Sequence, residues 1–145
     1  MLLNERVTRR SGGRGAETLT LTSPPLPSAP QQARDMALSA VLAWSLPVDP
    51  DELCLVTGEL VANAVTHAGT MISVRIRTRG AAVRVEVTDR DGRPPLLFAP
   101  GRSDETHWGL VVVAALASRW GYERLPTGKV VWAEVDFAPD PVPVG

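Results

Sequence analysis

One stretch, LCLVTGELVANAVTHA at residues 53–68, constrains the fold more than any other part of the sequence. Its large polar side chains are Glu59, Asn63 and His67, which recur every four residues and therefore lie in one stripe of a helix. The remaining helix surface is apolar nearly all round, a pattern typical of a buried helix. A buried carboxylate, amide and imidazole are costly unless polar groups meet them. The stripe therefore predicts a polar cavity, a ligand or a metal on that side.

Composition indicates one globular domain. The 145 residues are too few for two comfortable domains, and a hydrophobic content of 44% suffices for a core. A net charge of −1, without a concentrated basic stretch, argues against a nucleic-acid-binding surface. Because the sequence has neither a membrane-length apolar run nor a signal peptide, we expect a cytoplasmic protein. The single cysteine, Cys54, is interpreted as a small buried hydrophobe.

The first half of the chain predicts a tail, a strand and two helices. Residues 1–16 carry arginines among glycines and serines, which predicts a disordered tail or, alternatively, a basic arm for an acidic partner. A strand is predicted at residues 17–22 and a helix at 29–45, with prolines after each. The polar-striped helix then begins at 49–51 and ends at Gly69, which suits a left-handed cap.

Two hairpins are predicted further along. Alternating apolar residues predict strands at 72–77 and 83–88, joined by a tight turn at Gly80, and a second hairpin at 120–137. Asp89 continues the parity of the valines in its strand, so its carboxylate is predicted to point to the buried side at the strand's end.

A loop and a third helix separate the hairpins. Residues 90–107 are rich in proline and glycine and are long enough to form a binding lid, and Gly109 to Trp120 forms an apolar helix. Together these elements predict a two-layer α+β sandwich, with helices on one face of a mixed, mostly antiparallel sheet. The domain is predicted to span 17–138, followed by a loose tail at 139–145.

The polar positions suit the parts of a nucleotide. Asn63 can complete the octahedron of a magnesium ion, and Glu59, one turn earlier, can accept a proton from the attacking group. Asp89 in an apolar slot can accept the exocyclic amine of adenine. The start of the helix at Gly109 offers backbone N–H groups to phosphates, which arginines or a histidine can neutralise. These are Arg90, Arg93, Arg102 and His107.

Four segments together resemble the GHKL superfamily of ATPases. GELVANAVTHA resembles its N-box, VEVTDRDGRPP its first glycine box, ETHWGLVVVAALASRWG its second glycine box, and TGKVVWAEV its terminal strand. The resemblance covers residues 17–137 in the family's order. It implies ATP and Mg²⁺ as cofactors, Glu59 as the catalytic base and Asn63 as the metal ligand. The nucleotide-binding residues that it implies are Asn63, Asp89, Gly92, His107, Trp108, Gly109 and Leu110.

Within the superfamily the chain looks most like the bacterial anti-sigma-factor serine/threonine kinases. This implies a kinase that binds a sigma factor and phosphorylates a STAS-domain anti-anti-sigma protein, as a homodimer and without direct contact to nucleic acid or membrane. Two departures bear on ATP binding and phosphoryl transfer: DRDGR at 89–93 replaces Asp-x-Gly-x-Gly, and HWGL at 107–110 replaces Gly-x-Gly-Leu. The alternative is a non-catalytic module that sequesters a partner and binds nucleotide weakly or not at all. A split histidine kinase is disfavoured, because the chain has no dimerising helical hairpin with a phospho-acceptor histidine.

The candidate residues also have structural interpretations. Glu59 and Asn63 can form a hydrogen-bonded pair between helices, and His67 can cap carbonyls at a helix end. Asp89 can simply start a turn. The charged residues that alternate with apolar ones along the strands are predicted to form a solvated face, paired across strands. They are Arg75, Arg77, Arg84, Glu86 and Glu134.

Overall fold

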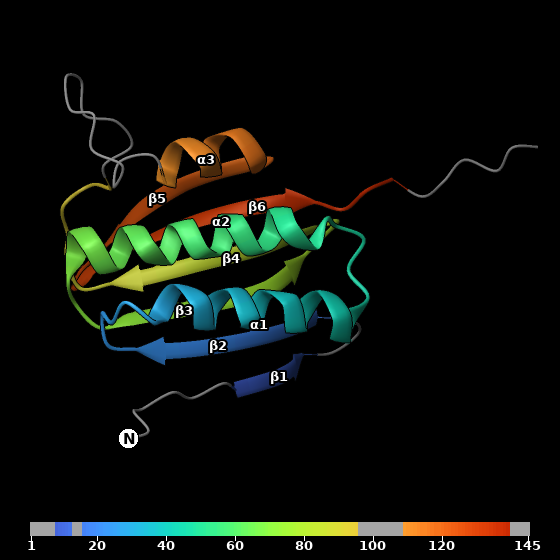
Figure 1. Ribbon diagram of the computed structural model, residues 1–145, viewed down its shortest axis with the longest axis horizontal. Coiled ribbons are helices and arrows are strands. Elements are labelled where there is room, and N and C mark those ends of the chain that lie inside the picture. Colours follow the sequence, from blue (N-terminus) through green and yellow to red (C-terminus); the bar gives the residue numbers. More distant parts are fainter. Residues whose placement is uncertain (1–7, 13–15, 96–108, 140–145) are drawn as a thin grey trace, which may run out of the picture.

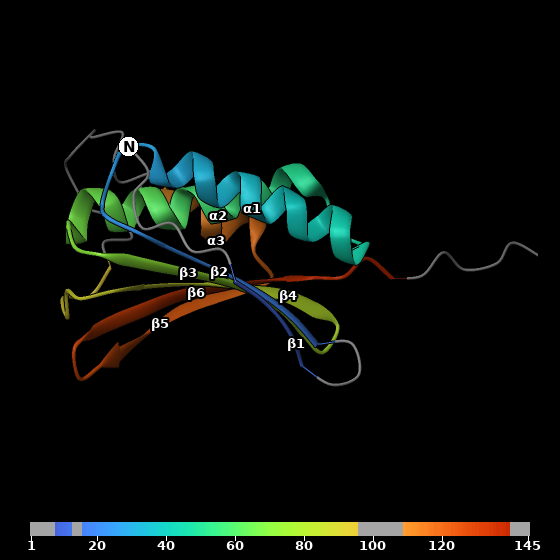
Figure 2. The same cartoon turned by 90° about the horizontal axis from the view of Figure 1, so that it is seen from below.

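The computed structural model describes residues 8–12, 16–95 and 109–139, which form a sheet covered on one face by helices (Figure 1). Figure 2, turned by 90°, shows that the helices lie on the same side of the sheet. The strands follow the order β1-β2-β3-β4-β6-β5, and each neighbouring pair is antiparallel. The predicted two-layer α+β sandwich is therefore confirmed, although the described sheet is antiparallel throughout rather than mixed.

The elements alternate along the chain much as the periodicity predicts. The strands are β1 Thr8–Gly12, β2 Ala16–Ser23, β3 Ile72–Arg79, β4 Ala82–Asp89, β5 Arg119–Leu125 and β6 Gly128–Asp136. The helices are α1 Ala29–Trp44, α2 Pro50–Asn63, the π-helix η1 Ala64–Ala68 and α3 Gly109–Leu116. In the part of the chain that the structure describes, no helix is long and apolar enough to cross a membrane.

The core lies between the sheet and α2. Alternation along the strands turns apolar side chains toward the helices, and α2 meets them with Leu53, Val56 and Leu60, each at most 2% exposed. α1 and α3 flank α2 on either side (Figure 1). The outward side of α2 stays open, because Leu55 is 42% exposed. The expectation of a helix buried all round is therefore wrong on that side.

Both ends of the long helical segment are capped. The Asp49 carboxylate accepts hydrogen bonds from the backbone N–H groups of Asp51 (2.9 Å) and Glu52 (3.4 Å), which otherwise lack partners at a helix N-terminus. At the other end Gly69 adopts a φ of 63°, the left-handed conformation predicted for it.

The N-terminal segment differs from its prediction. Within the predicted disordered tail at 1–16, Thr8–Gly12 forms β1 and pairs with β2 at the sheet edge. The prediction is wrong for these residues because it relied on the absence of apolar periodicity. An edge strand can be held by backbone hydrogen bonds, which need no such pattern.

The third helix is shorter than predicted. The apolar pattern predicts a helix as far as Trp120, but α3 ends at Leu116 and the chain then joins the sheet. The Ser118 N–H donates to the Glu134 carbonyl at 2.8 Å, and the Arg119 guanidinium hydrogen-bonds the Glu134 carboxylate at 3.0 Å. These contacts with β6 favour the start of β5 at Arg119 over a continuation of α3 beyond Leu116.

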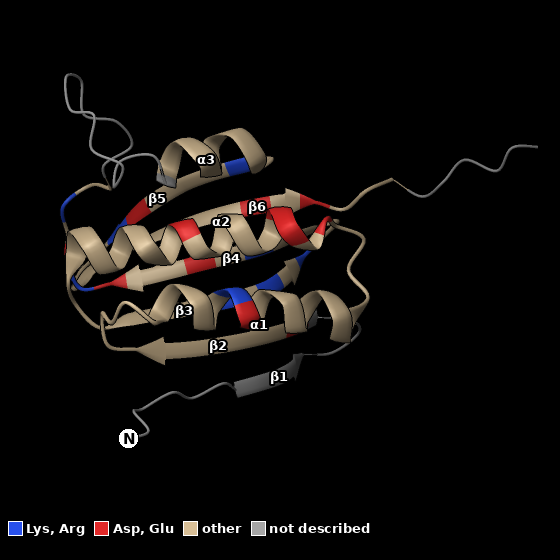
Figure 3. Ribbon diagram, viewed as in Figure 1, with Lys and Arg blue, Asp and Glu red and all other residues tan. Residues whose placement is uncertain are grey.

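Charged residues of both signs lie along the strands (Figure 3), and arginines pair with glutamates across neighbouring strands. Glu86 accepts a hydrogen bond from Arg77 and Glu134 one from Arg84, each at 2.9 Å. Burial raises the pKa of both carboxyls, but the arginine hydrogen bonds and charges outweigh it and hold each pKa below its ordinary value. The predicted cross-strand pairing is confirmed. The predicted solvation is wrong for Arg84, Glu86 and Glu134, which are 7–8% exposed beneath neighbouring side chains; Arg84 lies 4.2 Å from the ring centroid of Trp132.

Candidate functional site

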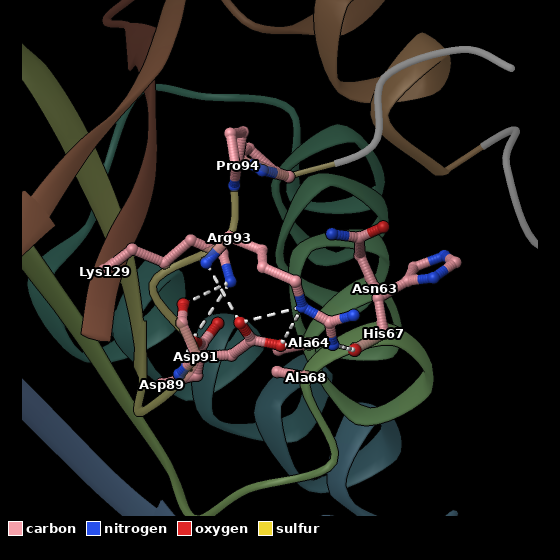
Figure 4. Close-up of a pocket in the computed structure, with 10 residues that line it drawn as sticks. Asn63, Ala64, His67, Ala68, Asp89, Asp91, Arg93, Pro94 and Lys129 are labelled. Carbon is pink, nitrogen blue, oxygen red and sulfur yellow. Dashed lines mark hydrogen bonds and ion pairs between the residues drawn. The ribbon is translucent and has the colours of Figure 1, made fainter. Parts of the chain in front are cut away.

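A cavity of about 130 Å³ lies between the C-terminal end of α2 and the end of β4 (Figure 4). It brings together Asn63 and Asp89, two residues that the sequence singles out from distant elements. Both are well buried, with 7% and 3% of their surface exposed. The other lining residues come from η1, from the segment after β4 and from β6: Ala64, His67, Ala68, Asp91, Arg93, Pro94, Pro95 and Lys129.

The π-helical turn shapes the helix wall of this cavity. In η1 the Gly69 N–H donates to the Ala64 carbonyl at 3.2 Å, a wider turn than in an α-helix. Asn63 and His67 line the cavity on either side of the start of this turn. Glu59, one turn earlier, is partly buried but is not one of the lining residues. Two of the three polar residues of the predicted stripe, Asn63 and His67, therefore line the cavity.

Asp89 forms a buried ion pair that the sequence analysis missed. Its Oδ1 accepts hydrogen bonds from the Asp91 N–H at 2.8 Å and from Lys129 Nζ at 3.1 Å. Lys129 is 5% exposed, and its Nζ also donates to the Asp91 carbonyl at 2.8 Å. The sequence held part of the signal, because Lys129 continues the inward parity of Val131 in β6. Its position opposite Asp89 is seen only in the sheet register.

Gly128 allows β6 to approach the end of β4 closely at this pair. A Cβ atom at Gly128 would lie 1.9 Å from the Asp89 carbonyl oxygen and 2.7 Å from Arg90 Cα. No side chain fits at these distances, so a glycine is required beside the residue that carries the buried ammonium.

Arg93 spans the mouth of the cavity (Figure 4). Its Nη2 donates to the Asp91 carboxylate at 2.6 Å and to the His67 carbonyl at 3.3 Å, and so connects the segment after β4 to the end of η1. The Arg93 hydrogen bonds hold the pKa of Asp91 well below its ordinary range. Because the Arg93 side chain is 78% exposed, its guanidinium can reorient toward an anionic ligand without leaving a buried position.

The remaining predicted residues lie apart from the cavity or beyond the described ranges. Gly92 and Arg90 are exposed and do not line it, and the Arg90 N–H donates to Thr70 Oγ1 at 2.9 Å. Gly109 begins α3, and Leu110 is 1% exposed with its side chain in the core. The predicted lid from residue 96 onward lies outside the residues that the structure describes, as do Arg102, His107 and Trp108.

The donor set fits a nucleotide base better than a tightly held metal. A buried carboxylate, an ammonium and the Asn63 amide meet in one cavity and offer both acceptors and donors. Among residues 8–12, 16–95 and 109–139, no three His, Cys, Asp or Glu side chains cluster as metal ligands. A magnesium ion here would be held by Asn63, with phosphate oxygens and water as its other ligands.

Comparison with known proteins identifies the family and agrees with the fold. The sequence model of the histidine kinase-like ATPase domain family matches residues 24–135. The uncharacterized protein SCO4941 of Streptomyces coelicolor is 38% identical over an alignment of 81 residues, and the match covers 52% of this chain and 77% of that protein. The crystal structure of the RsbU and RsbW domains of Rv1364c from Mycobacterium tuberculosis is similar over 84% of this chain, with a TM-score of 0.60 and 20% identity. The chain spans 34% of that structure's length, and the likeness concerns the fold.

Proposed function

Because the chain belongs to the family of histidine kinase-like ATPase domains, we propose that it is an ATP-binding regulatory protein whose nucleotide occupies the cavity between α2 and β4. The observation that carries this proposal is the convergence of Asn63 and Asp89 on one cavity from elements far apart in the sequence. A buried acceptor in a small slot is what base recognition requires, and an amide oxygen nearby suits a phosphate-bound magnesium ion.

The finer proposal is a serine/threonine protein kinase of the anti-sigma-factor type. Its partners would be a sigma factor and a STAS-domain anti-anti-sigma protein, as the motif resemblance implies. The likeness in fold to the structure of the RsbU and RsbW domains supports a protein of this type. Phosphoryl transfer needs mainly positioning and charge neutralisation. Asn63 would hold the magnesium ion, which would neutralise charge on the phosphates when bound. Asp89 would orient the base, and Glu59 would accept the proton of the attacking hydroxyl from its position one turn before Asn63.

A second candidate, a partner-sequestering module with weak or no nucleotide binding, is favoured by a specific observation. Asp89 is already paired with Lys129, and Arg93 lies across the cavity mouth. A nucleotide would have to compete with these internal contacts or share them. The two candidates therefore differ in the affinity for ATP rather than in the fold.

Calorimetric titration with ATP, with and without Mg²⁺, separates them. The kinase proposal expects micromolar binding that is weakened without Mg²⁺, reduced by Asn63→Ala and lost in Asp89→Asn. Asp35→Asn is a matched control, because Asp35 is an exposed carboxylate on α1 far from the cavity in sequence and absent from its lining. Binding that passes this test leads to an assay of phosphate transfer to a partner serine or threonine. No heat at millimolar ATP in the unaltered protein would reject the kinase proposal and leave the sequestering module.

A further inference from the structure

Lys129 places a hydrogen-bond donor directly beside Asp89, the acceptor proposed above to bind the nucleotide base. We call the part of the cavity at Asp89 and Lys129 the base slot. An ammonium has three N–H donors, and two of those on Lys129 point to Asp89 Oδ1 and to the Asp91 carbonyl. Neither the third donor nor Asp89 Oδ2 has a hydrogen-bond partner among the residues that the structure describes. Since both side chains line the cavity, a ligand there meets a donor and an acceptor side by side.

Such a pair has a different chemical preference from a lone carboxylate. A carboxylate alone accepts from the exocyclic amine of either base, but it offers no donor to the guanine carbonyl oxygen and repels that oxygen where the two lie side by side. An ammonium beside it can donate to the guanine carbonyl, a contact that lysine makes commonly to this base. The adjacent ring N–H and exocyclic amine of guanine can then donate to the free carboxylate oxygen, and both contacts are charge-assisted.

We propose that Lys129 is a specificity-determining residue of the base slot, which admits guanine nucleotides as well as adenine nucleotides. This inference rests on the nucleotide site proposed above. It is independent of whether the protein transfers phosphate. The geometry that carries it is the 3.1 Å contact between Nζ and Asp89 Oδ1, because a base bonded to Oδ2 of the same carboxylate lies next to the ammonium.

Competitive displacement of a fluorescent ATP analogue by unlabelled ATP, GTP and inosine triphosphate tests the proposal by binding alone. In the unaltered protein we expect GTP to bind within roughly tenfold of ATP. Inosine triphosphate keeps the carbonyl and ring N–H of guanine without its amine, so it is expected to follow GTP. Lys129→Met should weaken GTP relative to ATP by about tenfold or more, the effect of one charge-assisted hydrogen bond, whereas Lys129→Arg should retain GTP binding.

Arg124→Met is the matched control. Arg124 pairs with Lys129 across β5 and β6 but is exposed and absent from the cavity lining, so its loss should leave the GTP to ATP ratio unchanged. Thermal melts identify any variant that fails to fold. The ratio of GTP to ATP affinity in the unaltered protein tests the proposal even if the variants do not fold. Two results would overturn the role of Lys129 and leave the ATP site standing. The unaltered protein could bind GTP more than about a hundredfold more weakly than ATP, or folded Lys129→Met could show an unchanged ratio of GTP to ATP affinity. Absence of binding by every nucleotide would overturn both.

Discussion

Gly128→Ala tests the close approach of β6 to the end of β4, on which the Asp89–Lys129 pair depends. The added Cβ would lie 1.9 Å from the Asp89 carbonyl oxygen and 2.8 Å from its carbonyl carbon, whereas real Cβ contacts stay beyond 3.0 Å. The two strands must therefore separate locally by about 1 Å, against backbone atoms that cannot rotate away. Overpacking and a φ of 155° together predict a loss of about 2–5 kcal/mol in the free energy of unfolding.

Urea unfolding of Gly128→Ala beside Gly92→Ala measures this effect. Gly92 is the matched control, because nothing lies within 4 Å of the Cβ position there and its φ is not positive. Its substitution is expected to change the free energy of unfolding by no more than about 0.5 kcal/mol. If Gly128→Ala were as stable as Gly92→Ala, β6 would not approach Asp89 as described, and the reasoning about the pair would fail with it.

Three further predictions concern stability. Asp89→Asn leaves the buried Lys129 ammonium without its counter-charge and should lower the free energy of unfolding, measured in urea, by about 3 kcal/mol. The double variant Asp89→Asn with Lys129→Met should restore most of this loss. If the effects of the two substitutions simply added, the ion pair would be contradicted. Asp49→Ala removes the α2 cap and should lower the free energy of unfolding by about 1 kcal/mol in thermal melts, and an unchanged melt would rule out the cap. Glu86 and Glu134 have pKa values in the folded protein below their ordinary 4.5, so their ionised carboxylates stabilise the fold. This stabilisation is fully present above pH 4.5 and is lost as the pH falls through the folded pKa values. Acid titration of Glu86→Gln should show a shallower loss than the unaltered protein, and an identical curve would contradict this.

The sheet could be predicted well because its signal is local. Strand residues alternate with a period of two, so the valines of β4 fix which side Asp89 faces, and its 3% exposure agrees with that parity. The same reasoning located the hairpin of β5 and β6. The end of α3 could not be found in this way, because the contacts of Ser118 and Arg119 with β6 override a helical pattern that continues beyond Leu116.

The candidate site could be predicted only in part because its geometry depends on pairing between distant strands. Asn63 and Asp89 were identified from their own neighbourhoods, and the cavity unites them. The role of Lys129 depends on the register between β4 and β6, which a single sequence does not display. The π-helical turn is likewise invisible to a pattern based on α-helical spacing. Glu59 and Asn63 both lie in α2 before this turn, so α-helical spacing does place them in one stripe, but Glu59 lies one turn before the cavity and does not line it.

The most direct test of the proposed nucleotide site is a two-dimensional amide NMR titration of the ¹⁵N-labelled protein with ATP and Mg²⁺. If ATP occupies the cavity, the largest shifts should fall on Asn63, His67, Asp89 and Lys129, with little change along the exposed side of α1. Saturable shifts confined to other parts of the chain, or no shifts at millimolar ATP, would contradict the site.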